Sequence, residues 1–257
     1  MNEESKEIMT QRSILAGQTP TVVVRADGSV TVEGWDSDRV RADSDNRWGL
    51  RIERRQAADI GRERARAAVG ERVLFDVSFD NPFNRSRRLV KHVQGEVIEV
   101  QLGDGQVRVP FHCELIVYAG RDAAVRHIQG RVTATSGRDL KLQDVQVLLH
   151  AAAGGDLDID CAVLKGSELK FSAGRDLRFY VRDLTDAKVI IKDLGSYWEA
   201  LLGEGRVKIK LLAGGDVTLV TDQEVRAQPP YYLLGNIERP ASGVDQSTAS
   251  TETPRQN

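Results

Sequence analysis

Apolar and polar residues alternate with a period of two through most of residues 111–228. The alternation surrounds a short phrase, in which a small residue is followed by Gly, one variable residue and Asp; the first copy begins at Ala119. Five and three residues before each Gly, and three and five residues after it, every position is apolar. Because successive side chains of a β-strand point to opposite faces, the pattern predicts a turn between two strands that each bury one face.

The copies of this phrase follow one another at separations of 17, 17, 20 and 40 residues. A period of 17–20 residues, with room for two strands, a turn and a second bend, is typical of one coil of a parallel β-helix. Residues 111–228 contain no proline, which agrees with central strands because proline cannot donate a ladder hydrogen bond. The turn repeat consists of Gly120 and Asp122, Gly137 and Asp139, Gly154 and Asp156, Gly174 and Asp176, and Gly214 and Asp216.

We therefore predict an all-β fold, a single-stranded parallel β-helix (solenoid) with coils of 17–20 residues and a right-handed crossover. One copy is missing between Gly174 and Gly214, and there Val189 and Ile191 occupy the apolar positions. We expect a degenerate coil at this place, carrying an insertion at residues 196–205.

The first part of the chain has a less regular β pattern. Two strands around residues 26–29, and two more around residues 103–105, each predict a hairpin from their turn residues. Residues 55–70 are rich in Ala and Arg and predict a helix, which Gly61 weakens.

One elongated domain accommodates all of these elements. We divide the chain into an N-terminal extension (1–19), a β-rich N-terminal part with a basic insertion (20–110) and the regular β-helix coils (111–228). A C-terminal cap (229–240) and a tail that we expect to be disordered (241–257) follow.

Composition excludes several classes of protein. The chain is 40% hydrophobic and 29% charged with a net charge of -2, so no overall basic excess indicates nucleic acid or an anionic membrane. The N-terminus lacks the positive and apolar regions of a signal peptide, and no apolar run reaches the roughly 20 residues of a membrane span. We expect a cytoplasmic protein and leave association with the cell envelope open.

Cysteines and histidines show no spacing typical of a metal site. Cys113 and Cys161 lie in apolar stretches, where we expect buried, reduced thiols, and the four histidines lack ligand spacing. No nucleophile motif, phosphate loop or paired acid and base is present, although Asp158 and Asp160 point outward from one strand. We expect no enzyme activity, no catalytic residue, no metal and no cofactor.

The Gly-x-Asp repeat has a functional and a structural interpretation. Stacked carboxylates beside glycine turns bind calcium in nonapeptide β-rolls, but the period here is 17–20 residues. We favour the structural interpretation, in which Gly supplies a positive φ and Asp accepts hydrogen bonds from its own turn. Arg121, Arg138 and Arg175 then lie beside the aspartates and relieve their repulsion.

Two places are candidates for a ligand surface. Tyr197 and Trp198 fall in the expected insertion, where a loop on a rigid scaffold can hold a ligand. Arg85, Arg87 and Arg88 belong to a basic segment, yet acidic residues interrupt the basic stretch before it, so we do not expect nucleic acid.

Several motifs together resemble those of the bacterial putative-adhesin β-solenoid domain family. They are GSVTVEGWDSDRV at residues 28–40, VRVP at 107–110 and the AGRD, SGRD and AGGD phrases that follow, and the resemblance covers residues 20–225. The resemblance implies an adhesin-like β-helix that acts as an envelope-associated binding or stress-response module, with no catalytic residues. The chain departs from the family pattern in its three turn arginines and in the basic segment 54–92.

The sequence thus leads to three functional hypotheses. The first is a non-catalytic binding or scaffold module that self-associates through its coil ends or binds another protein. The second is an envelope-associated, adhesin-like or stress-response module that binds a glycan or peptide. The third, a polysaccharide-processing enzyme, is disfavoured by the missing catalytic constellation. The ligand and the partner stay unidentified at this stage.

Overall fold

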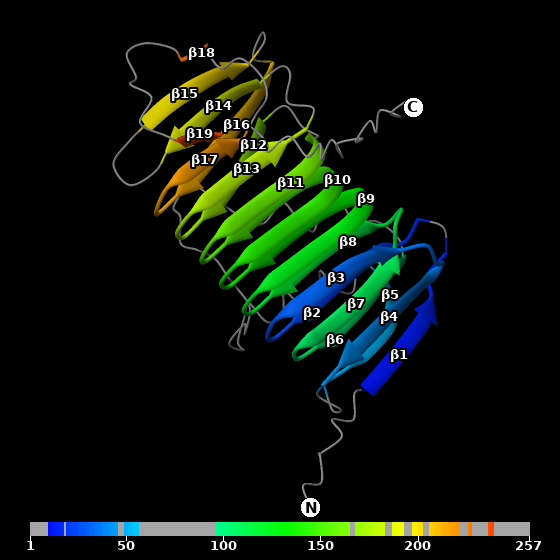
Figure 1. Cartoon of the computed structure of the whole chain (residues 1–257). Coiled ribbons are helices and arrows are strands. Elements are labelled where there is room, and N and C mark those ends of the chain that lie inside the picture. Colours follow the sequence, from blue (N-terminus) through cyan, green and yellow to red (C-terminus); the bar gives the residue numbers. More distant parts are fainter. Residues whose placement is uncertain are drawn as a thin grey trace, which may run out of the picture.

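The computed structural model describes residues 10–17, 19–45, 49–56, 96–164, 168–182, 187–192, 197–202, 206–220, 226–227 and 236–238. In these ranges the regular elements are β-strands, and nineteen of them join into one open, mixed sheet (Figure 1). The chain is therefore all-β, as the alternating pattern predicts. Within the described ranges, no helix is long and apolar enough to cross a membrane.

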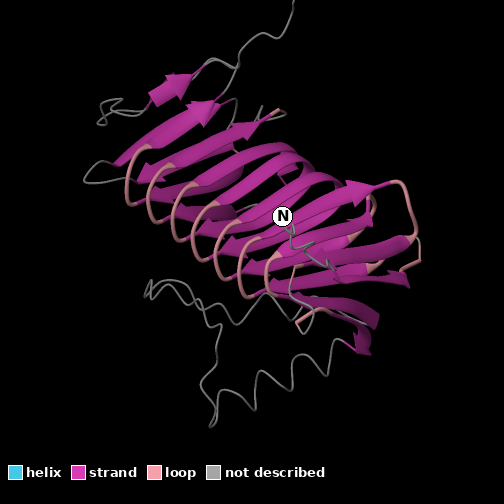
Figure 2. Cartoon of the chain, turned by 60° about the horizontal axis from the view of Figure 1, so that its bottom comes forward, coloured by secondary structure: helices cyan, strands magenta, loops and turns pink. Residues whose placement is uncertain are grey.

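Two ladders of strands run along the molecule, one on each side of the row of turns that Figure 2 shows. The central strands of the first ladder precede the turns. Its order is β5 (Arg51–Gln56), β6 (Glu96–Leu102), β2 (Thr21–Ala26), β8 (Glu114–Ala119), the second halves of β9 (Ala123–Ser136) and β10 (Leu140–Ala153), β12 (Glu168–Ala173), β16 (Val207–Ala213), β14 (Ala187–Lys192), β15 (Tyr197–Leu202) and β18 (Arg226–Ala227).

The central strands of the second ladder follow the turns. Its order is β1 (Thr10–Leu15), β4 (Arg39–Ser44), β7 (Gly105–Pro110), β3 (Val30–Trp35), the first halves of β9 and β10, β11 (Leu157–Leu164), β13 (Leu177–Val181), β17 (Val217–Val220) and β19 (Asn236–Glu238). The middle of both ladders is parallel, whereas β5, β15 and β18 in the first and β1 and β4 in the second pair antiparallel.

The order of the strands in space differs from their order in the sequence at both ends. β2 lies between β6 and β8, and β3 lies between β7 and β9, so the first strand pair is inserted between the second and the third. At the other end β16 pairs directly with β12, and β14 lies on the far side of β16. The outermost positions of the parallel part thus belong to β6 and β7 at one end and to β14 and β19 at the other.

These pairings correct three predictions. The strands around residues 26–29 and 103–105 do not form hairpins, because each pairs in parallel with strands from other turns. Val189 and Ile191 do face the core, but their strand β14 is placed beyond β16 instead of between β12 and β16. The expected insertion at residues 196–205 contains strand β15, which pairs antiparallel with β14.

The core lies between the inward faces of the two ladders. Nineteen of the twenty predicted apolar positions beside the turns are at most 5% exposed. The exception is Leu149, which is half-buried because the register shifts between Leu148 and His150, so that the fully buried Leu148 takes the inward place. Phe171 and Phe179 pack together across one turn, with their ring centroids 5.5 Å apart.

The predicted helix at residues 55–70 falls almost entirely outside the described residues. Its first two residues, Arg55 and Gln56, end strand β5 instead. Residues 57–92 of the basic segment, most of the C-terminal cap and the tail are likewise outside the described residues. Strand β19 of the cap is described and adds to β17 in parallel.

Candidate functional site

The turn glycines are required by close stacking of neighbouring turns. A methyl group on Gly137 would overlap the carbonyl oxygen of Gly120 in the turn below it, and a methyl group on Gly174 or Gly214 meets the equivalent backbone oxygen. The five repeat glycines do not have a positive φ, so that part of the prediction is wrong. The missing Cβ, and not a left-handed backbone, explains the glycine column.

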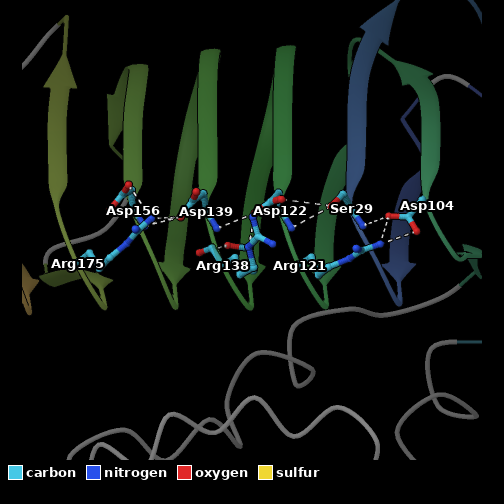
Figure 3. A network of polar contacts seen from close by, with 9 residues as sticks. Ser29, Asp104, Arg121, Asp122, Arg138, Asp139, Asp156 and Arg175 are labelled. Atoms are coloured by element: carbon cyan, nitrogen blue, oxygen red, sulfur yellow. Dashed lines mark hydrogen bonds and ion pairs between the residues drawn. The ribbon is translucent and has the colours of Figure 1, made fainter.

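The repeat aspartates form a continuous column of hydrogen bonds along the turns (Figure 3). Each carboxylate accepts a hydrogen bond from the backbone N–H of the aspartate in the next turn, at 3.3 Å from Asp139 to Asp122 and 2.9 Å from Asp156 to Asp139. Asp176 and Asp216 continue the pattern at 3.2 and 2.9 Å. The prediction that each aspartate caps its own turn is therefore wrong, because the acceptor serves the neighbouring turn.

Two further residues belong to this aspartate column, and sequence reasoning missed both. The Ser29 backbone N–H donates to Asp104 at 2.7 Å, and the Ser29 hydroxyl lies 3.4 Å from Asp122 (Figure 3). The column therefore runs Asp104, Ser29, Asp122, Asp139, Asp156, Asp176 and Asp216. Only the inserted position of the first strand pair brings Ser29 between Asp104 and Asp122.

Arginines of the turns bind the column from outside. Arg121 donates two hydrogen bonds to Asp104, at 2.7 and 2.8 Å, and therefore reaches back over the turn that contains Gly28. Arg175 in the same way reaches over the turn of Gly155 to Asp139 and also contacts Asp156, both at 2.9 Å. Arg121 and Arg175 thus link alternate turns.

Glycine at the turn position that other copies fill with arginine makes room for this reach. A methyl group on Gly28 would overlap the carboxylate of Asp104, and one on Gly155 would overlap that of Asp139. Arg138 lies in the turn after the one that carries Arg121. Its Nε is 3.3 Å from Oδ1 of Asp122, the aspartate of the Arg121 turn. Whether the preceding turn carries Gly or Arg at this position therefore sets which aspartate each arginine binds.

This geometry favours a structural role for the column. Carboxylate oxygens that accept backbone N–H groups and arginine N–H groups are already satisfied, whereas a calcium site needs six to eight oxygens free to converge on one ion. Among the described residues, no group of three His, Cys, Asp or Glu side chains is arranged to hold a metal.

Asp139 gives a test of the column through pH. The Asp156 backbone N–H and, after it, Arg175 hold the pKa of the Asp139 carboxyl below its ordinary value. Because the pKa is lower in the folded chain, the stabilisation is present above the unfolded pKa and is lost as the pH falls through the folded pKa. We expect thermal stability to fall below about pH 4, and the Asp139→Asn variant to lose less stability over that range.

Thermal melts at several values between pH 6 and pH 2.5 measure this difference. Asp158→Asn is a matched control, because the Asp158 carboxylate lies 3.9 Å from Lys141 and from Arg178 and accepts no turn N–H in the described column. Equal pH slopes for the wild type and Asp139→Asn would contradict the role assigned to Asp139.

A second polar cluster lies at the bend between the two ladders. His127 and Asp144 occupy equivalent places in the paired strands β9 and β10, both with a left-handed backbone, at φ values of 56° and 53°. His127 Nδ1 is 3.1 Å from Asp144 Oδ2, and Arg182 donates to Asp144 at 2.7 Å and to Asp160 at 3.2 Å. Arg182 and then His127 lower the pKa of the Asp144 carboxyl.

Sequence reasoning did not predict this bend cluster. The signal was present, because residues 127 and 144 are separated by one 17-residue repeat and therefore lie side by side in neighbouring strands. His127 and Asp144 are about half exposed, with side-chain exposures of 49% and 50%. Asp160 belongs to this cluster through its ion pair with Arg182. The Asp158 carboxylate lies 3.9 Å from Lys141 and from Arg178. The outward carboxylate pair of β11 therefore consists of two ion-paired groups.

The two cysteines are buried free thiols, as predicted. Burial raises the pKa of Cys113 and of Cys161 to about 12. A thiol with so high a pKa carries almost no thiolate at neutral pH and is therefore a poor nucleophile.

The structure places the predicted ligand residues only in part. Tyr197 and Trp198 begin strand β15, opposite Lys192 and Ile191 of β14, so they belong to an antiparallel strand and not to a loop. Arg85, Arg87 and Arg88 lie outside the described residues. The ligand role of all five stays a prediction.

Comparison with known proteins gives little further information. No family model matches the chain, and no curated protein matches it. One solved structure, a putative cell adhesion protein from Clostridium sporogenes ATCC 15579, aligns with 90% of this chain and 99% of its own, at 9% identity and a TM-score of 0.32.

Proposed function

We propose that the chain is a parallel β-solenoid that serves as a non-catalytic binding or scaffold module and contacts its partner through its side surfaces. The observation that carries the proposal is the coverage of three of the four ladder ends: antiparallel strands β5, β4 and β1 cover β6 and β7 at one end, and β15 covers β14 in the first ladder at the other. A covered ladder end offers no parallel edge for adding another copy, so among the described strands the three-residue β19 alone leaves such an edge.

Charge on the closing strands supports the same proposal. Strand β5 carries Arg51, Glu53, Arg54 and Arg55, and Arg54 pairs with Glu96 at 2.9 Å. Charged residues on edge strands oppose pairing with a second chain. Self-association through the coil ends, which the sequence left open, is therefore disfavoured, and the side surfaces become the place for a partner protein.

The side surfaces also suit the alternative, an envelope-associated module that binds a glycan or peptide. The turn phrases that resemble the adhesin-like family favour this alternative, whereas the ion pairs of Asp158 and Asp160 oppose a role for them in polysaccharide cleavage. Tyr197 and Trp198 are the residues we propose for such contacts.

Light scattering after gel filtration, over a hundredfold range of concentration, tests the closed stack. We expect a monomer of 28.4 kDa at every concentration, and single short rods in negative-stain images. Growth into end-to-end rods would contradict the closed ends and support a self-assembling scaffold.

A further inference from the structure

Lysines gather on the outer face of the first ladder, on the neighbouring strands β12, β16 and β14. Together they are called the lysine surface, which consists of Lys170, Lys208, Lys210, Lys188 and Lys192. Their chain neighbours Leu169, Ile209 and Val189 belong to the main core. Because neighbouring side chains of a strand point to opposite faces, the lysines face away from the core.

Within the lysine surface, cations lie beside cations. The register pairs Lys170 with Lys210, and Lys208 with Lys188. Neighbouring strands are about 4.8 Å apart, and like charges opposite each other on a sheet are destabilising. Burial and, after it, Lys210 lower the pKa of the Lys170 ammonium group. The fold therefore loses stability by placing these charges together.

The outer face of the second ladder has the opposite arrangement. There Lys141, Asp158 and Arg178 are in register and alternate in sign from one strand to the next. The Asp158 carboxylate lies 3.9 Å from each of its two cationic neighbours. Ordinary solvated charges on this protein are thus paired across the strands, and the lysine surface departs from that rule.

The acidic residues near the lysine surface are fewer than the lysines. The charged residues of β12, β16, β14 and β15 are the five lysines and two glutamates. Glu168 is in register with Lys208, and Glu199 pairs with Lys188 at 2.5 Å. Cations therefore exceed carboxylates on this surface, although the whole chain has a net charge of -2. Such a local excess fits an anionic partner.

We propose that the lysine surface binds an extended acidic segment of a partner protein, with carboxylates at alternate positions. Lys208 and Lys210 are two residues apart on β16, so their positions are about 6.6 Å apart along the strand. The same spacing separates side chains on one face of any extended peptide, so alternate carboxylates can each meet one lysine. This inference rests on the proposed function, in which a partner contacts the side surfaces.

The residues between the lysines favour a peptide over a nucleic acid. Ser172, Leu212 and Ile190 are the other described side chains that face outward from β12, β16 and β14. None of these side chains is aromatic, whereas proteins hold single-stranded nucleic acids by stacking bases on aromatic rings. A lysine ammonium group is a point charge with rotatable donors, which suits separate carboxylates on a peptide.

Fluorescence anisotropy tests the lysine surface in the full-length protein, with a labelled peptide in which Glu alternates with Thr. A thymidine oligonucleotide of equal charge is the second probe. Replacing Lys170, Lys208 and Lys210 together with Gln is expected to weaken peptide binding at least about tenfold, because three ion pairs are lost.

The matched control replaces three cations on the outer face of the second ladder with Gln. These are Arg126, Lys141 and Arg178, which are all exposed. The control changes the net charge by the same amount, and we expect it to alter peptide binding less than about twofold.

A single charge reversal separates loss of binding from loss of folding. Lys170→Glu places a carboxylate in register with Lys210 and so reproduces the alternation found at Asp158. We expect the melting temperature to stay the same or rise, and peptide binding to weaken at least about tenfold.

The proposal is overturned if the lysine variants bind the peptide as tightly as the wild type, or if the control weakens binding equally. Tighter binding of the thymidine oligonucleotide than of the peptide would overturn it in favour of a nucleic acid. No binding of the peptide to the wild type at low salt would also overturn it. In that case, a monomer in light scattering would leave the wider proposed function standing, whereas growth into rods would contradict the proposed function itself.

Discussion

Replacing Leu142 with Asp is expected to prevent folding of the central strands. Leu142 is 1% exposed and stacks in register between Val125 and Ile159, which are both fully buried. A carboxylate there has no partner and meets only apolar side chains, at a cost of roughly 5 kcal/mol or more, which is comparable with the whole stability of many domains. Far-UV circular dichroism and gel filtration should show an unfolded or aggregated protein.

The neighbouring exposed position supplies the control for this substitution. Gln143 points outward in the same strand, beside Arg126 in the register. Gln143→Asp introduces the same carboxylate into solvent, and we expect the stability to change by no more than about 0.5 kcal/mol. A normally folded Leu142→Asp protein would show that the assigned face of this strand is wrong.

Replacing Gly137 with Ala is expected to destabilise the protein by roughly 2–4 kcal/mol. The added methyl group would overlap the backbone carbonyl oxygen of Gly120, and a backbone atom within a hydrogen-bonded stack cannot move without separating two turns. Urea unfolding followed by circular dichroism measures the free energy of unfolding.

Gly155→Ala is the matched comparison, because its methyl group would overlap a carboxylate oxygen of Asp139 instead of a backbone atom. The Asp139 side chain can rotate away, so we expect a smaller loss that comes from weakened hydrogen bonds to Asp156 and Arg175. An equal or larger effect at Gly155 would contradict the close-stacking explanation of the glycine column.

Local periodicity was sufficient to predict the strands and their buried faces. The alternation around each turn depends only on neighbouring residues, and it failed at Leu149, where a shift of register moves Leu148 inward. The order of the strands was not predictable in this way. Ala26 to Ser29 carries good hairpin turn residues, yet β2 pairs with β6 and β8, which come from distant parts of the sequence.

The aspartate column also has a part that local periodicity predicts and a part that depends on the order of the strands in space. Asp122, Asp139, Asp156, Asp176 and Asp216 share a visible repeat, whereas Ser29 and Asp104 join them only through the inserted strand pair. The contacts from Arg121 to Asp104 and from Arg175 to Asp139 skip one turn. Sequence spacing suggested arginines beside aspartates, but the partner of each depends on the order of the turns.

Disulfide trapping tests the central claim, that the first strand pair is inserted between the second and the third and thereby helps to close the stack. Thr31 of β3 lies beside Ala124 of β9 on one side and beside Gln106 of β7 on the other. Adjacent strands are about 4.8 Å apart, within reach of a disulfide, whereas strands separated by a third are about twice as far apart.

The measurement compares two double-cysteine variants under mild oxidation. Thr31→Cys with Ala124→Cys is predicted to form a disulfide rapidly, and Gln106→Cys with Ala124→Cys is predicted to stay reduced. If instead the second variant forms the disulfide and the first does not, the strands follow one another in sequence order, and the closed stack proposed for this protein is contradicted.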